Sequence, residues 1–305
     1  QAMCAKYFRS AIAMFAALFF MSMTSVSHAL PLVSAGYDLF QTQPGTSLDP
    51  AILQPSFPNP FPLPIPLPLP VIPLEGVPLG TFDFGGTVGV QSVGNTDTII
   101  RRLPPDADGA SGSDTVEIEL VALQLKSVDP VDLSVLGPLP SDSTIYITLQ
   151  SRRQPEDTAV APTLIPLAPP SDSTGEMTIN FVDANGGTFD SFFDVFFDVR
   201  LDAVDGDILF SADKQFATTG VEWGRIPDPF DILIEGINHF LAGSGDTSGD
   251  FFPVELTELA PVDDENTVHK VKTATIPEPA TSLLLLTGLL GVGALRRRKA
   301  AVEAA

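Results

Sequence analysis

The sequence predicts an all-β fold, an antiparallel β-sandwich with jelly-roll connections as one option. An N-terminal signal helix, a Pro-rich extended linker and a short C-terminal transmembrane helix are expected to flank it. Three observations lead to this prediction: short alternating segments without convincing amphipathic helices, a run with proline at every second position, and an apolar segment at each end. The 305 residues therefore divide into a signal peptide (1–29), a linker (30–78), an acidic β-sandwich domain (79–273) and a C-terminal region (274–305).

The N-terminal segment has the features of a secretory signal peptide. Residues 1–29 contain no acidic residue, carry two basic residues, and continue into an apolar stretch from Ala11 to Met23. Ser27 and Ala29 place small residues at −3 and −1, so we expect signal peptidase to cut after Ala29. The alternative is an uncleaved first anchor, which is disfavoured because the apolar run is shorter than the ~20 residues of a membrane span.

Residues 30–78 are predicted to be an extended linker because proline dominates their second half. Between Pro58 and Pro70 every second residue is proline, which removes backbone donors and favours polyproline II. Mostly apolar residues fill the alternate positions. A segment that lies across the domain surface, or binds a partner's aromatic groove, is therefore the alternative.

Residues 79–273 show the alternation of half-buried strands. Apolar and polar side chains alternate over residues 116–120, 145–149 and 177–181, and turn-forming residues separate the runs. After Ala122 the apolar residues of this segment move from even to odd positions, which predicts a bulge or a bend. Several such strands favour a β-sandwich.

One element, residues 188–204, is ambiguous between strand and helix. Its odd positions form an apolar strand face, yet its phenylalanines also fit a helical stripe. Phe, Val, Asp and Thr are poor helix formers, and a helix would stack like charges four residues apart. We therefore predict a long, bent strand. The charges concerned are Asp190, Asp194, Asp198 and Asp202.

The C-terminal region has the parts of a short membrane anchor. Pro277, Glu278 and Pro279 precede an uncharged run, residues 281–295. This span ends at a basic tail, which we expect to act as a membrane stop-transfer signal on the cytoplasmic side. The basic residues are Arg296, Arg297, Arg298 and Lys299. An ordinary tail anchor, or an amphipathic helix packed on the domain, is the alternative.

The order of these parts resembles the PEP-CTERM sorting region of bacterial exported proteins. The resemblance implies that Pro277, Glu278 and Pro279 form a sorting motif read by an exosortase, which detaches the protein from its anchor. It also implies export across a Gram-negative type envelope, with one C-terminal helix in the inner membrane and then a cell-surface or extracellular location. Association with exopolysaccharide or biofilm is a further implication. Much of residues 79–255 resembles, more loosely, PEP-CTERM-associated proteins of unknown function.

Charge excludes one class of partner. The chain has 16 Lys+Arg and 38 Asp+Glu, a formal charge of −22. Removal of the signal peptide and the sorting tail leaves 10 Lys+Arg and 36 Asp+Glu, or −26. Such a field repels polyanions, so we expect no nucleic-acid partner. The only cysteine, Cys4, lies in the signal peptide, so the exported chain is expected to have no disulfide.

The body offers few residues with a recognisable chemical pattern. His239 and His269 belong to no metal-binding or catalytic spacing, so we predict no catalytic residue and no metal ligand set. Calcium on acidic turns is the one cofactor that stays an alternative, with solvated turns as the simpler interpretation. Trp223 is either a core residue or a carbohydrate platform. The candidate calcium-binding pairs are Asp205 with Asp207, Asp106 with Asp108, and Asp246 with Asp250.

These observations favour a non-enzymatic, exosortase-sorted protein of the envelope or extracellular matrix. The alternative is a carbohydrate-binding or calcium-dependent adhesive β-sandwich delivered by the same route. An enzyme that acts on exopolysaccharide is the third hypothesis. The expected partners are signal peptidase, exosortase, the membrane and exopolysaccharide.

Overall fold

The computed structural model describes residues 32–53, 70–134, 140–157, 159, 167, 169–240, 249–253, 257–261 and 266–276. The chain divides into two compact units, Gln1–Leu30 and Pro31–Ala305. The first unit, with the predicted cleavage residue Ala29, lies outside the described residues.

The second unit consists mainly of antiparallel strands, which confirms the predicted all-β class. Among the described residues, two short 3₁₀ turns, η1 (Pro50–Leu53) and η3 (Gln150–Arg152), interrupt them. The strands are β1 (Leu32–Val33), β2 (Gly36–Thr42), β3 (Ser47–Leu48), β4 (Ile72–Gly76), β5 (Gly80–Asp83), β6 (Val90–Gly94), β7 (Thr98–Arg102), β8 (Ala107–Asp108), β9 (Ser113–Ser127), β10 (Ile145–Leu149), β11 (Ser173–Asp183), β12 (Gly186–Leu201), β13 (Ile208–Gly224), β14 (Phe252–Pro253), β15 (Thr257–Pro261) and β16 (His269–Thr273).

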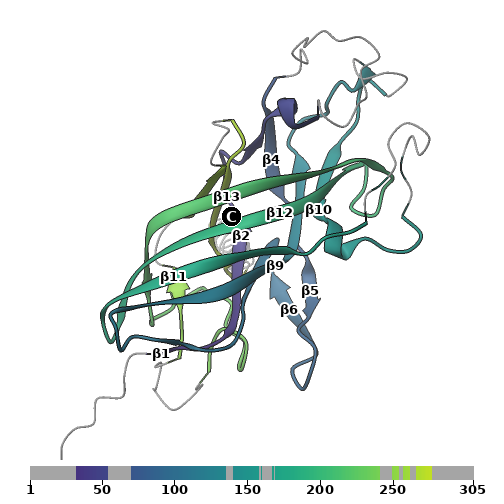
Figure 1. The fold of residues 1–305 in the computed structure, drawn as a ribbon. Coiled ribbons are helices and arrows are strands. Elements are labelled where there is room, and N and C mark those ends of the chain that lie inside the picture. Colours follow the sequence, from purple (N-terminus) through teal and green to yellow (C-terminus); the bar gives the residue numbers. More distant parts are fainter. Residues whose placement is uncertain are drawn as a thin grey trace, which may run out of the picture. The chain divides into compact units, whose positions relative to one another are not determined.

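Antiparallel pairings join several of these strands into a closed circuit, of which Figure 1 shows β9, β11, β12 and β13 side by side. The hydrogen-bonded neighbours are, in order, β12, β11, β9, β7, β2, β16, β15 and β13, and β13 pairs again with β12. β10 lies between β9 and β12, and β4 pairs with the end of β9. The inward faces of these strands share one apolar interior, as expected for a sandwich.

Bulges allow the longest strands to bend around this interior. In the pairing of β7 with β9, Ile99 lies opposite Ala122 and Ile100 opposite Leu120, so Val121 is an extra residue. This bulge lies one position from the predicted change of parity at Ala122, and it confirms that prediction. Strands β12 and β13 have 16 and 17 residues, and two more register shifts interrupt their pairing.

The ambiguous segment 188–204 is a strand over most of its length, as predicted. β12 pairs with β11 and β10 on one side and with β13 on the other. Its odd-numbered apolar side chains from Phe189 to Val199 are buried, whereas Leu201 is partly buried and Phe192 is exposed. The buried set is Phe189, Phe193, Val195, Phe197 and Val199.

The predicted boundary between linker and domain is wrong. β2 is an internal strand of the circuit, paired with β7 and β16, and β4 pairs with β9. Both strands fall within residues 30–78, so part of the predicted linker belongs to the domain. Pro73 lies within β4, and its neighbours Ile72 and Leu74 are both buried. Residues 54–69, which hold most of the proline alternation, lie outside the described residues.

A second apolar cluster lies on the other side of the sheet from the interior. It joins residues of β2, β7 and β9 to the β5–β6 hairpin and to the segment 232–237. Ala274, just beyond β16, is a fully buried member of this cluster. Its other buried members are Leu39, Phe82, Val93, Ile99, Ala122, Ile232 and Ile237.

A buried ion pair joins neighbouring strands of the circuit. The Arg102 guanidinium on β7 contacts the Asp38 carboxylate on β2, and both side chains are almost inaccessible to solvent. Arg102 also donates to the Ser34 carbonyl and lies 4.6 Å from the ring centroid of Phe251. Burial raises the pKa of Asp38, and the charge of Arg102 opposes that shift.

Replacing Arg102 with alanine should destabilise the domain strongly, because Asp38 would remain buried without its counter-ion. We expect a loss of about 3–5 kcal/mol in the free energy of unfolding, measured by urea denaturation. Arg101→Ala is the matched control, since Arg101 is 43% exposed and lies 3.7 Å from Glu119. That control should change stability by less than about 1 kcal/mol. Equal losses in both variants would contradict a special role for the buried pair.

Candidate functional site

The chain is fixed on the domain as far as its last described residue. After β16, the Ala274 N–H donates to a carbonyl of β2 at 2.8 Å. Thr275 forms an antiparallel bridge with Asp231. The Ile276 N–H then donates to the Phe230 carbonyl at 2.8 Å. The folded domain therefore extends to the residue that precedes the predicted sorting tripeptide.

The predicted sorting and anchoring residues follow this exit point directly. Pro277, Glu278 and Pro279 lie outside the described residues, and so does the basic tail Arg296, Arg297, Arg298 and Lys299. In the described part of the chain, no helix is long and apolar enough to cross a membrane. The predicted span, residues 281–295, also lies outside that part.

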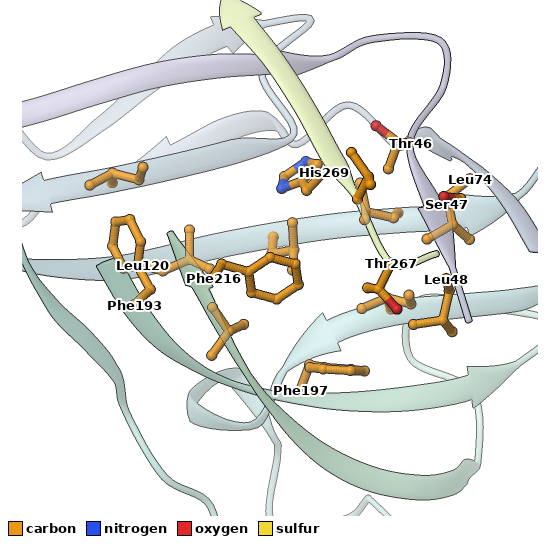
Figure 2. Close-up of a pocket in the computed structure, with 16 residues that line it drawn as sticks. Thr46, Ser47, Leu48, Leu74, Leu120, Phe193, Phe197, Phe216, Thr267 and His269 are labelled. Atoms are coloured by element: carbon orange, nitrogen blue, oxygen red, sulfur yellow. The ribbon is translucent and has the colours of Figure 1, made fainter. Parts of the chain in front are cut away.

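A small cavity of about 50 Å³ lies in the apolar interior (Figure 2). Phe193 and Phe197 of β12, Phe216 of β13 and Leu120 of β9 form much of its wall. Small-molecule pockets usually measure about 300–1,000 Å³. This cavity is therefore better explained as a gap in core packing than as a ligand site.

His269 lines the same cavity and belongs to a buried chain of hydrogen bonds. Its Nε2 lies 3.1 Å from the Thr42 hydroxyl, which donates to the Asp97 carboxylate at 2.7 Å. The Thr42 N–H and the Thr98 hydroxyl also donate to that carboxylate. Burial lowers the pKa of His269 to about 4 and raises the pKa of Asp97 to about 6.

The order of this chain differs from that of a nucleophilic triad. In such a triad the imidazole stands between the hydroxyl and the carboxylate. Here the Thr42 hydroxyl stands in the middle and gives its proton to Asp97. His269 Nε2 therefore carries the hydrogen that the Thr42 oxygen accepts, and the arrangement links β2 to β16.

His239 pairs with one member of a predicted calcium pair. Its Nδ1 lies 2.8 Å from an Asp250 carboxylate oxygen, and the Phe240 N–H donates to the other oxygen at 2.9 Å. Asp250 is fully buried. Both of its oxygens thus have protein partners, while Asp246 lies outside the described residues.

Groups in the two other predicted calcium pairs also accept hydrogen bonds from the protein. Asp106 accepts the Ala35 N–H at 2.7 Å, and Asp108 accepts the Ala110 N–H at 3.0 Å. The Gly206 carbonyl, between Asp205 and Asp207, accepts from Arg200. Within the described ranges, no group of three or more His, Cys, Asp or Glu residues is arranged to hold a metal ion.

Trp223 lies in the interior, so it is the core residue rather than the carbohydrate platform. Its side chain is 2% exposed. The indole stacks on Phe251 at 5.1 Å between centroids and meets the edge of Phe181 at 5.5 Å. The guanidinium of Arg225 lies 5.3 Å from its ring centroid.

A polar cleft of about 370 Å³ separates the β5–β6 hairpin from β9, β10 and β12. Arg152 lies on one wall, 4.8 Å from the ring centroid of Phe82. Arg200 on the other wall is held by Thr148 at 2.9 Å and by Asp157. Desolvation lowers the pKa of Arg152, against the opposing charge of Glu119. Gln124, Gln154, Asp83 and Asp205 add further polar groups to the lining.

Comparison with known families decides the nature of the C-terminal region. The family model described as PEP-CTERM protein-sorting motif matches residues 275–299. The chain carries a PEP-CTERM motif. The match begins at Thr275, which is still bridged to Asp231. No curated protein and no solved structure matches the chain in the corresponding comparisons.

The PEP-CTERM motif establishes the coarse biology of the chain. It marks an exported protein that is anchored through its C-terminus and then processed by an exosortase. The tripeptide Pro277, Glu278 and Pro279 falls inside the matched range. The function of the individual sorting residues and the cleavage after Ala29 remain predictions.

The low pKa of His269 makes stability depend on pH. The folded state disfavours the protonated form of His269. The contribution of the neutral imidazole to the free energy of unfolding is therefore present above pH 6.5 and is lost as pH falls toward 4. Relative to His269→Gln, wild-type protein should lose on the order of 3 kcal/mol of unfolding free energy between pH 7 and pH 4.

Urea denaturation of both proteins at each pH measures this difference. Asp97 opposes the trend, because its raised pKa makes its contribution fall as pH rises from about 4 to about 6. Since both proteins contain Asp97, subtraction isolates the histidine to first order. Parallel stability curves for wild type and His269→Gln would show that His269 titrates normally.

Proposed function

We propose that the chain is a non-enzymatic protein of the cell envelope or extracellular matrix, associated with exopolysaccharide or biofilm. The observation that carries this proposal is the position of the sorting motif. The matched residues 275–299 begin where β16 ends and where the domain still holds the backbone. Exosortase processing would therefore deliver the whole acidic β domain as one folded cargo.

The charge distribution supports a matrix role. Three of the ten cationic residues in the body form buried or largely buried ion pairs with aspartates. These are Arg102, Arg153 and Arg200. Each pair is neutral as a whole, so the excess of −26 remains on the other residues of the body. A body with this charge stays hydrated and gathers divalent cations, which can bridge it to an acidic polysaccharide.

The sorting step can be tested on the tripeptide itself. Replacing Pro277, Glu278 and Pro279 with alanines should leave full-length protein in the membrane, because the exosortase loses its recognition sequence. Intact mass spectrometry of medium and membrane fractions from the native host measures the outcome. Wild-type protein in the medium should lack the mass of the signal peptide and the sorting tail.

The chain contains a matched control for this experiment. Pro227, Asp228 and Pro229 repeat the order of proline, acid and proline after an isoleucine, but no apolar run follows them. Alanines at these three positions should leave release into the medium unchanged. Release of the Pro277–Pro279 variant at the wild-type rate would refute processing at the tripeptide.

Carbohydrate binding is the second candidate, and the polar cleft favours it. Arg152, Gln124 and Gln154 line a space of about 370 Å³, a size that accommodates a sugar unit. The Arg152 Nε donates to the Val121 carbonyl, which holds the guanidinium in place at the cleft. Arg200, which also lines the cleft, is fixed by Thr148 and by the Gly206 carbonyl. Hydroxyl-rich ligands need several directional polar partners of this kind.

Arg152→Ala should weaken binding of the host's purified exopolysaccharide about tenfold, because one charged hydrogen-bond donor is lost. Isothermal titration calorimetry measures the affinity, and thermal unfolding confirms that the variant is folded. Arg101→Ala is the control, since Arg101 is absent from the cleft lining. Unchanged affinity for Arg152→Ala would remove the cleft from consideration.

A further inference from the structure

Exposed apolar side chains gather where the chain leaves the domain. We call Phe230, Leu233 and Ile276 the exit face; they are 64%, 43% and 56% exposed. Ile276 donates its N–H to Phe230, and it shares a shallow depression with Leu233. Soluble domains seldom place large apolar groups together without a partner.

An ordered loop holds these side chains outward. Between the exposed residues, Ile232 and Ile237 are buried in the second apolar cluster. The Ile232 N–H donates to the Ala274 carbonyl at 3.1 Å. Asn238 closes the loop, because its amide donates to the Ile232 carbonyl and its oxygen accepts the Ile234 N–H. The exit face is thus a fixed surface.

The covalent chain limits how far this face can lie from the membrane before processing. Four residues, 277–280, separate Ile276 from the apolar run that begins at Thr281. Even a fully extended chain covers only about 17 Å over the five steps from Ile276 to Thr281. While the tail is anchored, Ile276 therefore lies no more than about 17 Å from the start of the apolar run, which corresponds to about two to three headgroup layers.

We propose that the exit face rests on the outer lipid surface of the membrane while the C-terminal anchor is in place. Aromatic and aliphatic side chains suit the interface between headgroups and acyl chains. This inference depends on C-terminal anchoring and goes beyond the proposed matrix role.

The charged residues beside the exit face indicate which class of lipid headgroup it would contact. Asp228 and Glu235 are exposed in the same loop, whereas Asp231 is buried, and the body as a whole carries −26. A polybasic patch that would select anionic lipids is missing from the loop 226–239. The surface fits zwitterionic headgroups, such as phosphatidylethanolamine, whose ammonium groups can pair with the carboxylates.

The opposite end of β9 provides a matched control position. β9 runs from Ser113, near the β11–β12 turn, to Ser127, which pairs with Leu74 of β4. Val128 follows this far end and is 51% exposed. The exit face follows β13, whose Gly224 pairs with Gly186 at the near end. Val128 and Leu233 thus have similar exposure, and Val128 is absent from the depression that Leu233 shares with Ile276.

The test uses the full chain with Cys4→Ser and one introduced cysteine, Leu233→Cys or Val128→Cys. Each is labelled with an environment-sensitive fluorophore and reconstituted through its tail into phosphatidylethanolamine–phosphatidylcholine vesicles, with retention checked by carbonate extraction. At position 233 we expect the fluorophore to emit at a shorter wavelength and to be quenched by spin-labelled lipid. At position 128 we expect the emission of a fluorophore in water, without quenching. Replacing half of the lipid with phosphatidylglycerol should reduce the shift at position 233.

The other outcomes overturn the proposal. Equal signals at both positions would show that the exit face has no preferred orientation toward lipid. A shift at position 233 that requires added exosortase would show that a protein, not lipid, covers the face. Loss of the chain on carbonate extraction would remove the anchor on which the docking depends, whereas the polysaccharide-binding test would be unaffected.

Discussion

The shared interior of the domain depends on the ability of its longest strands to bend. A straight strand of 16 residues, the length of β12, would extend beyond the layer of a small sandwich. The bulge at Val121 in β9 and the register shifts between β12 and β13 curve these strands so that the pairings return to their starting point. This closure aligns the inward side chains around one core.

The closed circuit also determines where polar groups can be buried. Asp38, Arg102 and His269 lie on strands of the circuit, Asp97 directly precedes β7, and all four have low solvent exposure. Each contacts a group from another strand, so ionic and hydrogen-bonding partners connect β2 to β7 and to β16. Removing one partner leaves the other buried, which is costly even where the intact pair adds little net stability.

Strands could be predicted from the sequence where apolar and polar residues alternate over a few positions. The strands around Val116, Ile145 and Met177, and the parity change near Ala122, could be predicted because the side-chain period of a strand is visible in a few residues. The PEP-CTERM motif was equally local. β2 was missed because its seven residues contain Asp38, whose burial depends on an arginine 64 positions away.

Long-range partners explain the other omissions. The contact between Thr42 and His269 spans 227 positions, and no local pattern marks it. The polar cleft combines residues of β5, β9, β10 and β12 with the segment after β10, so only the folded chain brings them together. The docking of Thr275 and Ile276 was unexpected for the same reason, since their partners lie in the loop around Phe230.

The pairing of β2 with β16 relates folding to the direction of secretion. β2 is among the first strands of the body to leave a secretion channel, and β16 is the last. The circuit cannot close until β16 has emerged, by which time the apolar run has reached the membrane. The exported chain must therefore remain incompletely folded during its passage, with unpaired strand edges that invite aggregation or proteolysis. Arrest of the tail in the membrane coincides with the arrival of the strand that completes the domain.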